Sequence, residues 1–198
     1  MVKGLPVEWG ACSRTVSSDD HTRTISYWNN TIAIGSEYGD IITLDALTGS
    51  QTAVLSGHRS RVNCLTFSSD GKSLVSGSHD STIKLWDMQT GGVVKTFYGD
   101  GEYFLSVSIS ADCTRIASGS GRVVHVWDIQ TGESHCTIEQ QYQVEHVNFS
   151  PTDPQHLISI SGGEVWEWDV DGHQISPTYN GSYIAFSPDH TQDRKSVV

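Results

Sequence analysis

The chain has 198 residues, which is enough for a single domain with an apolar core of its own. It carries 12 basic and 23 acidic residues, a formal net charge of −11. Because an acidic surface repels phosphate backbones, this balance argues against nucleic-acid binding. Residues 1–14 contain no apolar run of signal-peptide length, and no segment approaches the length of a membrane span. We therefore expect a cytoplasmic protein that binds neither nucleic acid nor membrane.

The cysteines and histidines carry no metal-binding signature. Cys12, Cys64, Cys113 and Cys136 are far apart in the sequence, and none belongs to a Cys-x-x-Cys pair. The nine histidines include no His-x-x-x-His pair. We therefore predict no metal site and no cofactor, and we interpret the cysteines as small apolar residues that fill strands and turns.

The sequence contains an internal repeat. Four segments that end in aspartate recur along the chain, at residues 41–45, 83–87, 124–128 and 165–169. Their closing aspartates lie 42, 41 and 41 residues apart. A turn motif that begins Phe-Ser or Ile-Ser and ends in Asp keeps nearly the same step, and a Thr-Gly pair follows three of the segments. Three anchors that share one period predict a repeat protein.

Each repeat unit has the pattern of four short strands. In the second unit the apolar stretches are residues 62–67, 74–76, 82–86 and 93–97. The segments between them hold Ser, Asp and Gly, which bond back to the main chain or tolerate positive φ and so favour turns. Four strands in about forty residues are typical of a propeller blade, and blades must stack to bury both faces. The sequence therefore predicts an all-β fold, a β-propeller of four-stranded antiparallel blades.

The spacing of the anchors also predicts the blade boundaries within a single domain over residues 1–198. We place the blades at about 22–56, 58–98, 102–139 and 142–177, a partial blade at 179–198 and a closing strand at 11–17. A ring needs at least about four blades, so we expect an incomplete propeller of four blades plus the start of a fifth. An open ring exposes blade faces and unpaired edges, which predicts self-association or aggregation through them.

Residues 57–98 carry the motifs that are most specific. They contain Gly57-His58, then Ser-Gly-Ser-His-Asp over residues 76–80, then Ile-Lys-Leu-Trp-Asp over residues 83–87. With these motifs the chain resembles the WD (tryptophan–aspartate) repeat β-propeller family over roughly residues 20–190. The amino-acid sequence of its repeats is most similar to the repeat arrays of fungal NACHT-type signalling proteins. The resemblance implies a ring of about seven blades and a protein-binding role without catalysis.

The resemblance also implies a hydrogen-bonded tetrad of His58, Ser76, Asp80 and Trp86 inside the second blade. A buried indole N–H needs an acceptor, the accepting hydroxyl needs the imidazole, and the turn carboxylate fixes the imidazole tautomer. The same match identifies six residues as the repeat framework: Asp45, Asp87, Trp127, Asp128, Trp168 and Asp169.

The other blades depart from this pattern. In the third blade Asp100 replaces the histidine, and in the fourth Gly162-Gly163 replaces the turn that holds the aspartate. In the first blade Leu44, Ile34 and Tyr38 replace the tryptophan, the serine and the aspartate. A truncated network costs about 1–3 kcal/mol, so we expect modest stability.

These residues give little support to an enzymatic function. A Ser, a His and an Asp suggest hydrolysis, but here they occupy framework positions of a repeat, without a nucleophile elbow or an oxyanion-hole motif. A glycosidase needs two carboxyl groups facing across a pocket, whereas Glu164 and Glu167 fall on opposite faces of one strand. We therefore predict that the chain is not an enzyme.

Function on such a scaffold belongs to loops. The loops that join one blade to the next, and the corresponding inner turns, contain Tyr38, Arg59, Arg61, Tyr103 and Tyr142. Aromatic and Arg residues are typical of protein-binding hot spots, so the sequence predicts a protein–protein interaction scaffold that binds a protein or peptide. Capping of blade edges by the tyrosines and solvation of the arginines is the alternative for each residue. Two other functions remain open, the ligand-sensing repeat segment of a larger signalling ATPase and a glycan-binding propeller.

Overall fold

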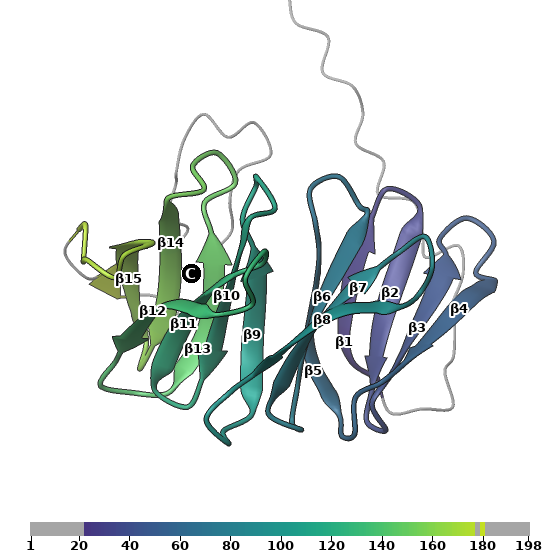
Figure 1. The fold of residues 1–198 in the computed structure, drawn as a ribbon, viewed down its shortest axis with the longest axis horizontal. Coiled ribbons are helices and arrows are strands. Elements are labelled where there is room, and N and C mark those ends of the chain that lie inside the picture. Colours follow the sequence, from purple (N-terminus) through teal and green to yellow (C-terminus); the bar gives the residue numbers. More distant parts are fainter. Residues whose placement is uncertain (1–21, 177–178, 181–198) are drawn as a thin grey trace, which may run out of the picture.

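The computed structural model describes residues 22–176 and 179–180. All regular elements in these ranges are strands, and no helix there is able to cross a membrane. The strands form four antiparallel sheets, each made of four strands in chain order. Figure 1 shows the sheets standing side by side as successive blades. This confirms the predicted fold class.

The strands of blades 1 and 2 are β1 (Thr22–Trp28), β2 (Thr31–Ser36), β3 (Asp40–Asp45), β4 (Gln51–Ser56), β5 (Val62–Phe67), β6 (Ser73–Ser78), β7 (Thr82–Asp87) and β8 (Val93–Tyr98). Those of blades 3 and 4 are β9 (Phe104–Ile109), β10 (Arg115–Ser120), β11 (Val123–Asp128), β12 (Ser134–Glu139), β13 (Val144–Phe149), β14 (His156–Ser161), β15 (Glu164–Asp169) and β16 (Tyr179–Asn180). Each strand pairs with the next along the chain, which makes every blade a four-stranded meander.

The outer strand of blade 4 lies beyond the predicted boundary at residue 177. Tyr179 pairs with Val165 and Asn180 with Glu164, so β16 completes the sheet of blade 4. The remainder of the partial blade predicted at 179–198, and the closing strand predicted at 11–17, lie outside the described residues.

Side chains alternate across each strand, so every blade presents one face to the blade before it and the other to the blade after it. At the junction of blades 1 and 2, Leu65, Leu74 and Trp86 pack against Ala33 and Ile41. The same strand positions recur at the junction of blades 2 and 3, where Trp127 and Ile116 join the cluster of Ile83, Leu85 and Phe97. The repeat period therefore fixes the core at each junction.

Small residues let the blades approach one another closely. A Cβ added to Gly77 would lie 2.6 Å from the Cys64 sulfur and 3.0 Å from the Cβ of Phe104, on the inner strand of blade 3. Gly119 holds the equivalent position in blade 3, where a Cβ would lie 2.7 Å from Val144 on the inner strand of blade 4. The inner strands β1, β5, β9 and β13 consequently lie next to one another.

The apolar face of blade 1 that points away from blade 2 is exposed. Ile25 and Tyr27 on β1 are 63% and 64% exposed, whereas Leu65, which holds the position of Ile25 in blade 2, is covered by blade 1. The sequence predicts exposed apolar side chains at an open blade face, and Ile25 and Tyr27 are of this kind. Self-association of the chain through them stays a prediction.

Candidate functional site

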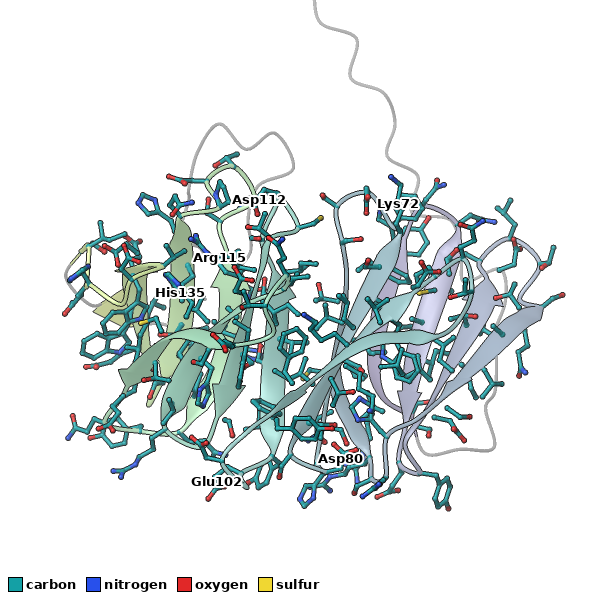
Figure 2. All side chains as sticks on the ribbon, viewed as in Figure 1. Lys72, Asp80, Glu102, Asp112, Arg115 and His135 are labelled. Atoms are coloured by element: carbon teal, nitrogen blue, oxygen red, sulfur yellow. The ribbon has the colours of Figure 1, made fainter. Side chains whose placement is uncertain are left out.

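The two ends of the blades differ in their turns. At one end, here called the loop end, lie the connections between blades and the turns between the second and third strand of each blade. Asp80 and Glu102 mark this end in Figure 2, and Lys72 and Asp112 mark the opposite end. The predicted tetrad belongs to segments that meet at the loop end. So do the five residues predicted to bind a partner, here called the rim residues: Tyr38, Arg59, Arg61, Tyr103 and Tyr142.

The structure brings the four predicted tetrad residues together in blade 2. The Trp86 indole N–H donates to the Ser76 hydroxyl at 2.8 Å, and that hydroxyl lies 2.7 Å from His58 Nε2. His58 Nδ1 lies 3.0 Å from the Asp80 carboxylate. All of these contacts are satisfied together when Ser76 donates to Nε2 and the imidazole carries its proton on Nδ1.

Two further groups complete the cluster in blade 2. The Thr82 hydroxyl donates to Asp80 at 2.6 Å, and the main-chain N–H of Arg59 donates to the same carboxylate at 2.8 Å. Burial raises the pKa of Asp80, but the hydrogen bonds from His58, Thr82 and Arg59 outweigh it and hold the pKa well below its usual range. An ionised Asp80 thus ties the loop before β5 to the turn before β7.

The cluster is a structural element and not a catalytic triad. Ser76 is fully buried, and its hydroxyl oxygen already accepts the Trp86 N–H. A nucleophile must reach the substrate, and this oxygen is closed off by the blade.

Blade 3 keeps only the indole and the hydroxyl of this cluster. Trp127 donates to Ser118 at 2.9 Å, while Asp100, at the histidine position, is exposed. His125, which the sequence analysis did not single out, stacks on Trp127 with ring centroids 5.2 Å apart. Burial lowers the pKa of His125, partly opposed by the charge of Asp100. A neutral imidazole therefore packs inside this blade.

Blade 4 replaces the imidazole by an amide. Trp168 donates to Ser159 at 2.9 Å, and the amide nitrogen of Gln140 donates to the same hydroxyl. Gln140 lies four residues before Val144, the first residue of β13, just as His58 precedes β5. That spacing was the signal that could have identified Gln140 from the sequence. In blade 1, by contrast, the equivalent of Trp86 is Leu44, which is buried.

The framework aspartates stabilise turns at the opposite end of the blades. Asp45, Asp87 and Asp128 each accept the main-chain N–H of a threonine three residues later, at 2.6, 2.7 and 2.7 Å. Asp169 accepts the main-chain N–H of His173 at 2.8 Å. In each case this main-chain hydrogen bond is the main reason that the pKa of the carboxyl lies below its ordinary value. These four residues shape the blades and belong to no binding surface at the loop end.

At the loop end, Tyr103 connects three blades. Its ring stacks on His79 of blade 2, with centroids 4.8 Å apart and an angle of 7° between the planes. Its hydroxyl accepts a hydrogen bond from Gln143, in the loop that leads into blade 4, at 3.5 Å. Arg61 lies beside this stack, because its main-chain carbonyl accepts the His79 N–H at 2.9 Å. Arg61 Nε is buried and has no hydrogen-bond partner within the described part of the chain.

The other rim residues stand on neighbouring turns. Tyr38 and Tyr142 are 68% and 51% exposed, and Arg59 is exposed as well. The Tyr142 ring covers Gly162, where a Cβ would lie 2.3 Å from it. The structure therefore brings Arg61 and Tyr103 together through His79 and leaves Tyr38, Arg59 and Tyr142 as separate exposed groups on the same end.

Comparison with known proteins identifies the repeat. Residues 49–87 and 91–128 match the family model described as "WD domain, G-beta repeat". These two segments match WD40 repeats. These matched segments run through blades 2 and 3, which hold the full tetrad and its shortened form.

Similar proteins extend the likeness beyond the two matched segments. A guanine nucleotide-binding protein subunit beta-like protein of Encephalitozoon cuniculi is 27% identical over 214 residues, which cover 100% of this chain and 61% of that protein. The WD repeat-containing protein 89 homolog of Dictyostelium discoideum is 32% identical, over 70% of this chain and 38% of that protein. The COMPASS component SWD3 of Saccharomyces cerevisiae is 30% identical, over 62% of this chain and 42% of that protein.

The structural comparison agrees. A chain from a crystal structure of the mitotic checkpoint complex superposes with a TM-score of 0.74 at 25% identity, covering 84% of this chain and 55% of that one. The chain thus spans less than two thirds of the relatives it matches.

Proposed function

We propose that this chain is a non-catalytic WD40-type scaffold that binds a protein or peptide at its loop end. The observation that carries the proposal is the stack of His79 on Tyr103, which joins two blades next to the half-buried Arg61, whose main-chain carbonyl accepts the His79 N–H. Aromatic side chains held in a fixed position close to an arginine in the same loop cluster are typical of a binding hot spot. The partner covers the flat aromatic surface and offers Arg61 a carbonyl or carboxylate acceptor.

The surrounding residues support this assignment. Tyr142 and Tyr38 present exposed rings on the neighbouring blades, so a peptide that lies across the loop end meets aromatic surface on several turns. The tetrad anchors the loop that carries Arg59 and Arg61, since Asp80 binds that loop through His58 and the Arg59 N–H. The rim is therefore held in place before a partner binds, which limits the loss of entropy on binding.

The experiment compares proteins recovered by cross-linking and affinity capture on three forms of the chain. The test variant is Arg61→Ala/Tyr103→Ala, and the matched control is Gln130→Ala/Glu133→Ala, two exposed residues at the opposite end. Thermal melts establish that all three forms are folded. We expect partners that the parent chain and the control recover and the test variant loses. Recovery of the same partners by all three forms would contradict the proposal.

A narrower proposal rests on the likeness of the repeats to those of fungal NACHT-type proteins. In that case the same loop end is the ligand-sensing part of a larger cytoplasmic signalling ATPase. The prediction is a Gly-x-x-x-x-Gly-Lys-[Ser/Thr] motif in the same reading frame. Sequencing the full transcript decides it, because a complete reading frame without that motif excludes this version.

A further inference from the structure

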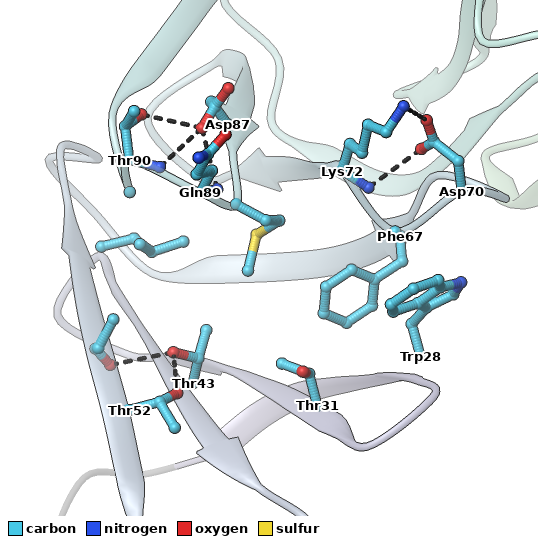
Figure 3. A pocket seen from close by; sticks show the side chains of 15 residues that line it. Trp28, Thr31, Thr43, Thr52, Phe67, Asp70, Lys72, Asp87, Gln89 and Thr90 are labelled. Atoms are coloured by element: carbon cyan, nitrogen blue, oxygen red, sulfur yellow. Dashed lines mark hydrogen bonds and ion pairs between the residues drawn. The ribbon is translucent and has the colours of Figure 1, made fainter.

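A pocket of about 650 Å³ lies between blades 1 and 2, at the end of the blades opposite the loop end. Figure 3 shows its mixed lining, with the Trp28 and Phe67 rings on one side and the Thr43 and Thr52 hydroxyls on another. Asp87 lies on its rim. A pocket with apolar walls and a few polar groups is a candidate binding site.

The junction of blades 2 and 3 shows what fills the equivalent space elsewhere in this chain. There Lys95 of β8 reaches across the junction, and its ammonium donates to the main-chain carbonyl of Gln130 at 2.6 Å. The stem of the lysine lies over the same turn, since a Cβ on Gly132 would be 3.1 Å from Lys95 Cδ. At that junction the chain therefore supplies its own lysine.

At the junction of blades 1 and 2 the equivalent lysine is missing. Lys95 pairs with Leu85 across β7 and β8, and Ala53 pairs with Thr43 at the same positions of β3 and β4. The Ala53 side chain is a single methyl group without a polar atom, so the space over the turn at residues 87–91 stays open. The pocket results from this substitution within the repeat.

The turn that would receive a lysine is retained. Gln89 lies two residues after Asp87, as Gln130 lies two residues after Asp128, and both turns continue Thr-Gly. Gln89, Thr90 and Gly91 line the pocket. A main-chain carbonyl in the position of the Gln130 carbonyl is thus available to an ammonium group from outside the chain.

The charges around the pocket favour a cation. Asp70 and Asp87 both line it, and the Lys72 ammonium is 3.5 Å from Asp70. One carboxylate, Asp87, is left in excess, in a chain with a formal net charge of −11. Hydrogen bonds from Thr90 keep the pKa of Asp87 below its ordinary value, so the carboxylate is ionised at neutral pH.

We propose that this pocket binds a lysine side chain of a partner polypeptide. The aliphatic stem lies along Leu55, Phe67 and Met88, and the ammonium donates to the Gln89 main-chain carbonyl, as Lys95 does to Gln130 inside the chain. The site is at the opposite end of the blades from Tyr103 and Arg61, so it is independent of the proposed function.

The probe is Nα-acetyl-lysine-N-methylamide, titrated into the isotopically labelled 198-residue chain and followed by amide chemical shifts. We expect saturable shifts at Thr52, Ala53 and residues 89–91. The norleucine analogue has the stem without the ammonium, and the Nε-acetylated analogue has a neutral amide, so both should shift these amides at least tenfold less. Equal responses to the three probes, or a response to the arginine analogue alone, would overturn the proposal.

Two reciprocal substitutions locate the response. Ala53→Lys places the chain's own lysine in the pocket and should abolish the probe-induced shifts, while the matched control Ala53→Ser should keep them. Lys95→Ala opens the equivalent space between blades 2 and 3 and should add shifts at residues 130–132. Shifts that persist in Ala53→Lys, together with none gained in Lys95→Ala, would contradict the assignment. Neither substitution should change capture of partners at the loop end, which separates this test from that of the proposed function.

Discussion

Gln140 hydrogen-bonds the Ser159 hydroxyl in blade 4 from the position at which His58 meets Ser76 in blade 2. The amide reaches the hydroxyl but has no carboxylate behind it, because the turn of blade 4 is Gly162-Gly163. The Gln140 Oε1 atom is buried and has no partner within the described part of the chain. Blade 4 thus keeps the hydrogen bond that orients Ser159. It lacks a carboxylate that would join the connecting loop to the turn between its second and third strands.

This arrangement predicts that Gln140→Ala destabilises the chain. The substitution removes the hydrogen bond to Ser159 and leaves a small cavity beside Trp168, and we expect a loss of about 1–3 kcal/mol in the free energy of unfolding. Urea unfolding followed by tryptophan fluorescence measures it. Gln143→Ala, three residues further along the same loop, is the control and should cost less than about 0.5 kcal/mol. Equal effects of the two substitutions would show that the buried amide contributes nothing specific.

The depressed pKa of Asp80 predicts a pH-dependent contribution to stability. A carboxyl group whose pKa is lower in the folded state stabilises the fold above its unfolded pKa of about 3.9, and this stabilisation is lost as the pH falls through the folded pKa. We expect Asp80→Asn to cost about 2 kcal/mol at neutral pH. Below about pH 4 the gap between variant and parent should narrow. Urea unfolding of both proteins across this pH range tests the trend, and a gap that is independent of pH would contradict it.

The repeat made much of this structure predictable. The spacing of the aspartates predicted a repeat of four-stranded blades, and the fold class is confirmed. His58, Ser76, Asp80 and Trp86 could be grouped only through the resemblance to the repeat family, because the other blades keep just the tryptophan and the serine, or neither. Gln140 was missed because an amide in place of an imidazole breaks the residue pattern, although its position four residues before β13 is that of His58 before β5. Thr82, which joins the cluster from the edge of the turn, was missed as well.

The pocket between blades 1 and 2 was hidden for a different reason. It depends on the difference between Ala53 and Lys95, which the repeat already aligns, because they lie as far apart in the sequence as Asp45 and Asp87. The sequence does not show that a side chain at this position reaches the turn of the next blade, as Lys95 does. In blades 1, 2 and 3 the pairing of the third strand with the fourth contains a register shift. Sequence alone does not place such a shift, so neither position could be assigned a neighbour in the next blade.

A second pH effect is expected from His125, and it begins at a higher pH than that of Asp80, because the ordinary pKa of histidine is higher. Burial lowers its pKa, so the neutral ring is favoured in the folded state and the unfolded state binds more protons. The stabilisation is therefore present above the unfolded pKa of about 6.5 and declines as the pH falls below it. His125→Phe keeps a ring against Trp127 and removes the titration. We expect the variant to lose less stability than the parent between about pH 8 and 5, measured by urea unfolding, and parallel curves would rule out a contribution from His125.

The turn of blade 2 requires glycine at position 71, where the Trp28 indole lies against it. Gly71 has a φ of 68°, and a Cβ there would lie 2.3 Å from the Trp28 indole, whose N–H donates to the Ser69 carbonyl at 3.2 Å. Gly71→Ala adds backbone strain and displaces the indole, so we expect a loss of about 2–4 kcal/mol. Cys113 holds the equivalent turn position in blade 3 with a φ of 57°, and there the small side chain of Ser69, 3.8 Å from its sulfur, lies against the turn in place of an indole.

The two causes can be separated by a double-mutant cycle. Gly71→Ala in a Trp28→Leu background retains the backbone strain but removes the clash, so the loss should fall to about 1 kcal/mol. Cys113→Ala is the matched control for a side chain at positive φ and should cost less than about 1 kcal/mol. A Gly71→Ala loss that is the same in both backgrounds would mean that the left-handed backbone alone, and not the contact between Trp28 and the turn of blade 2, requires glycine at this position.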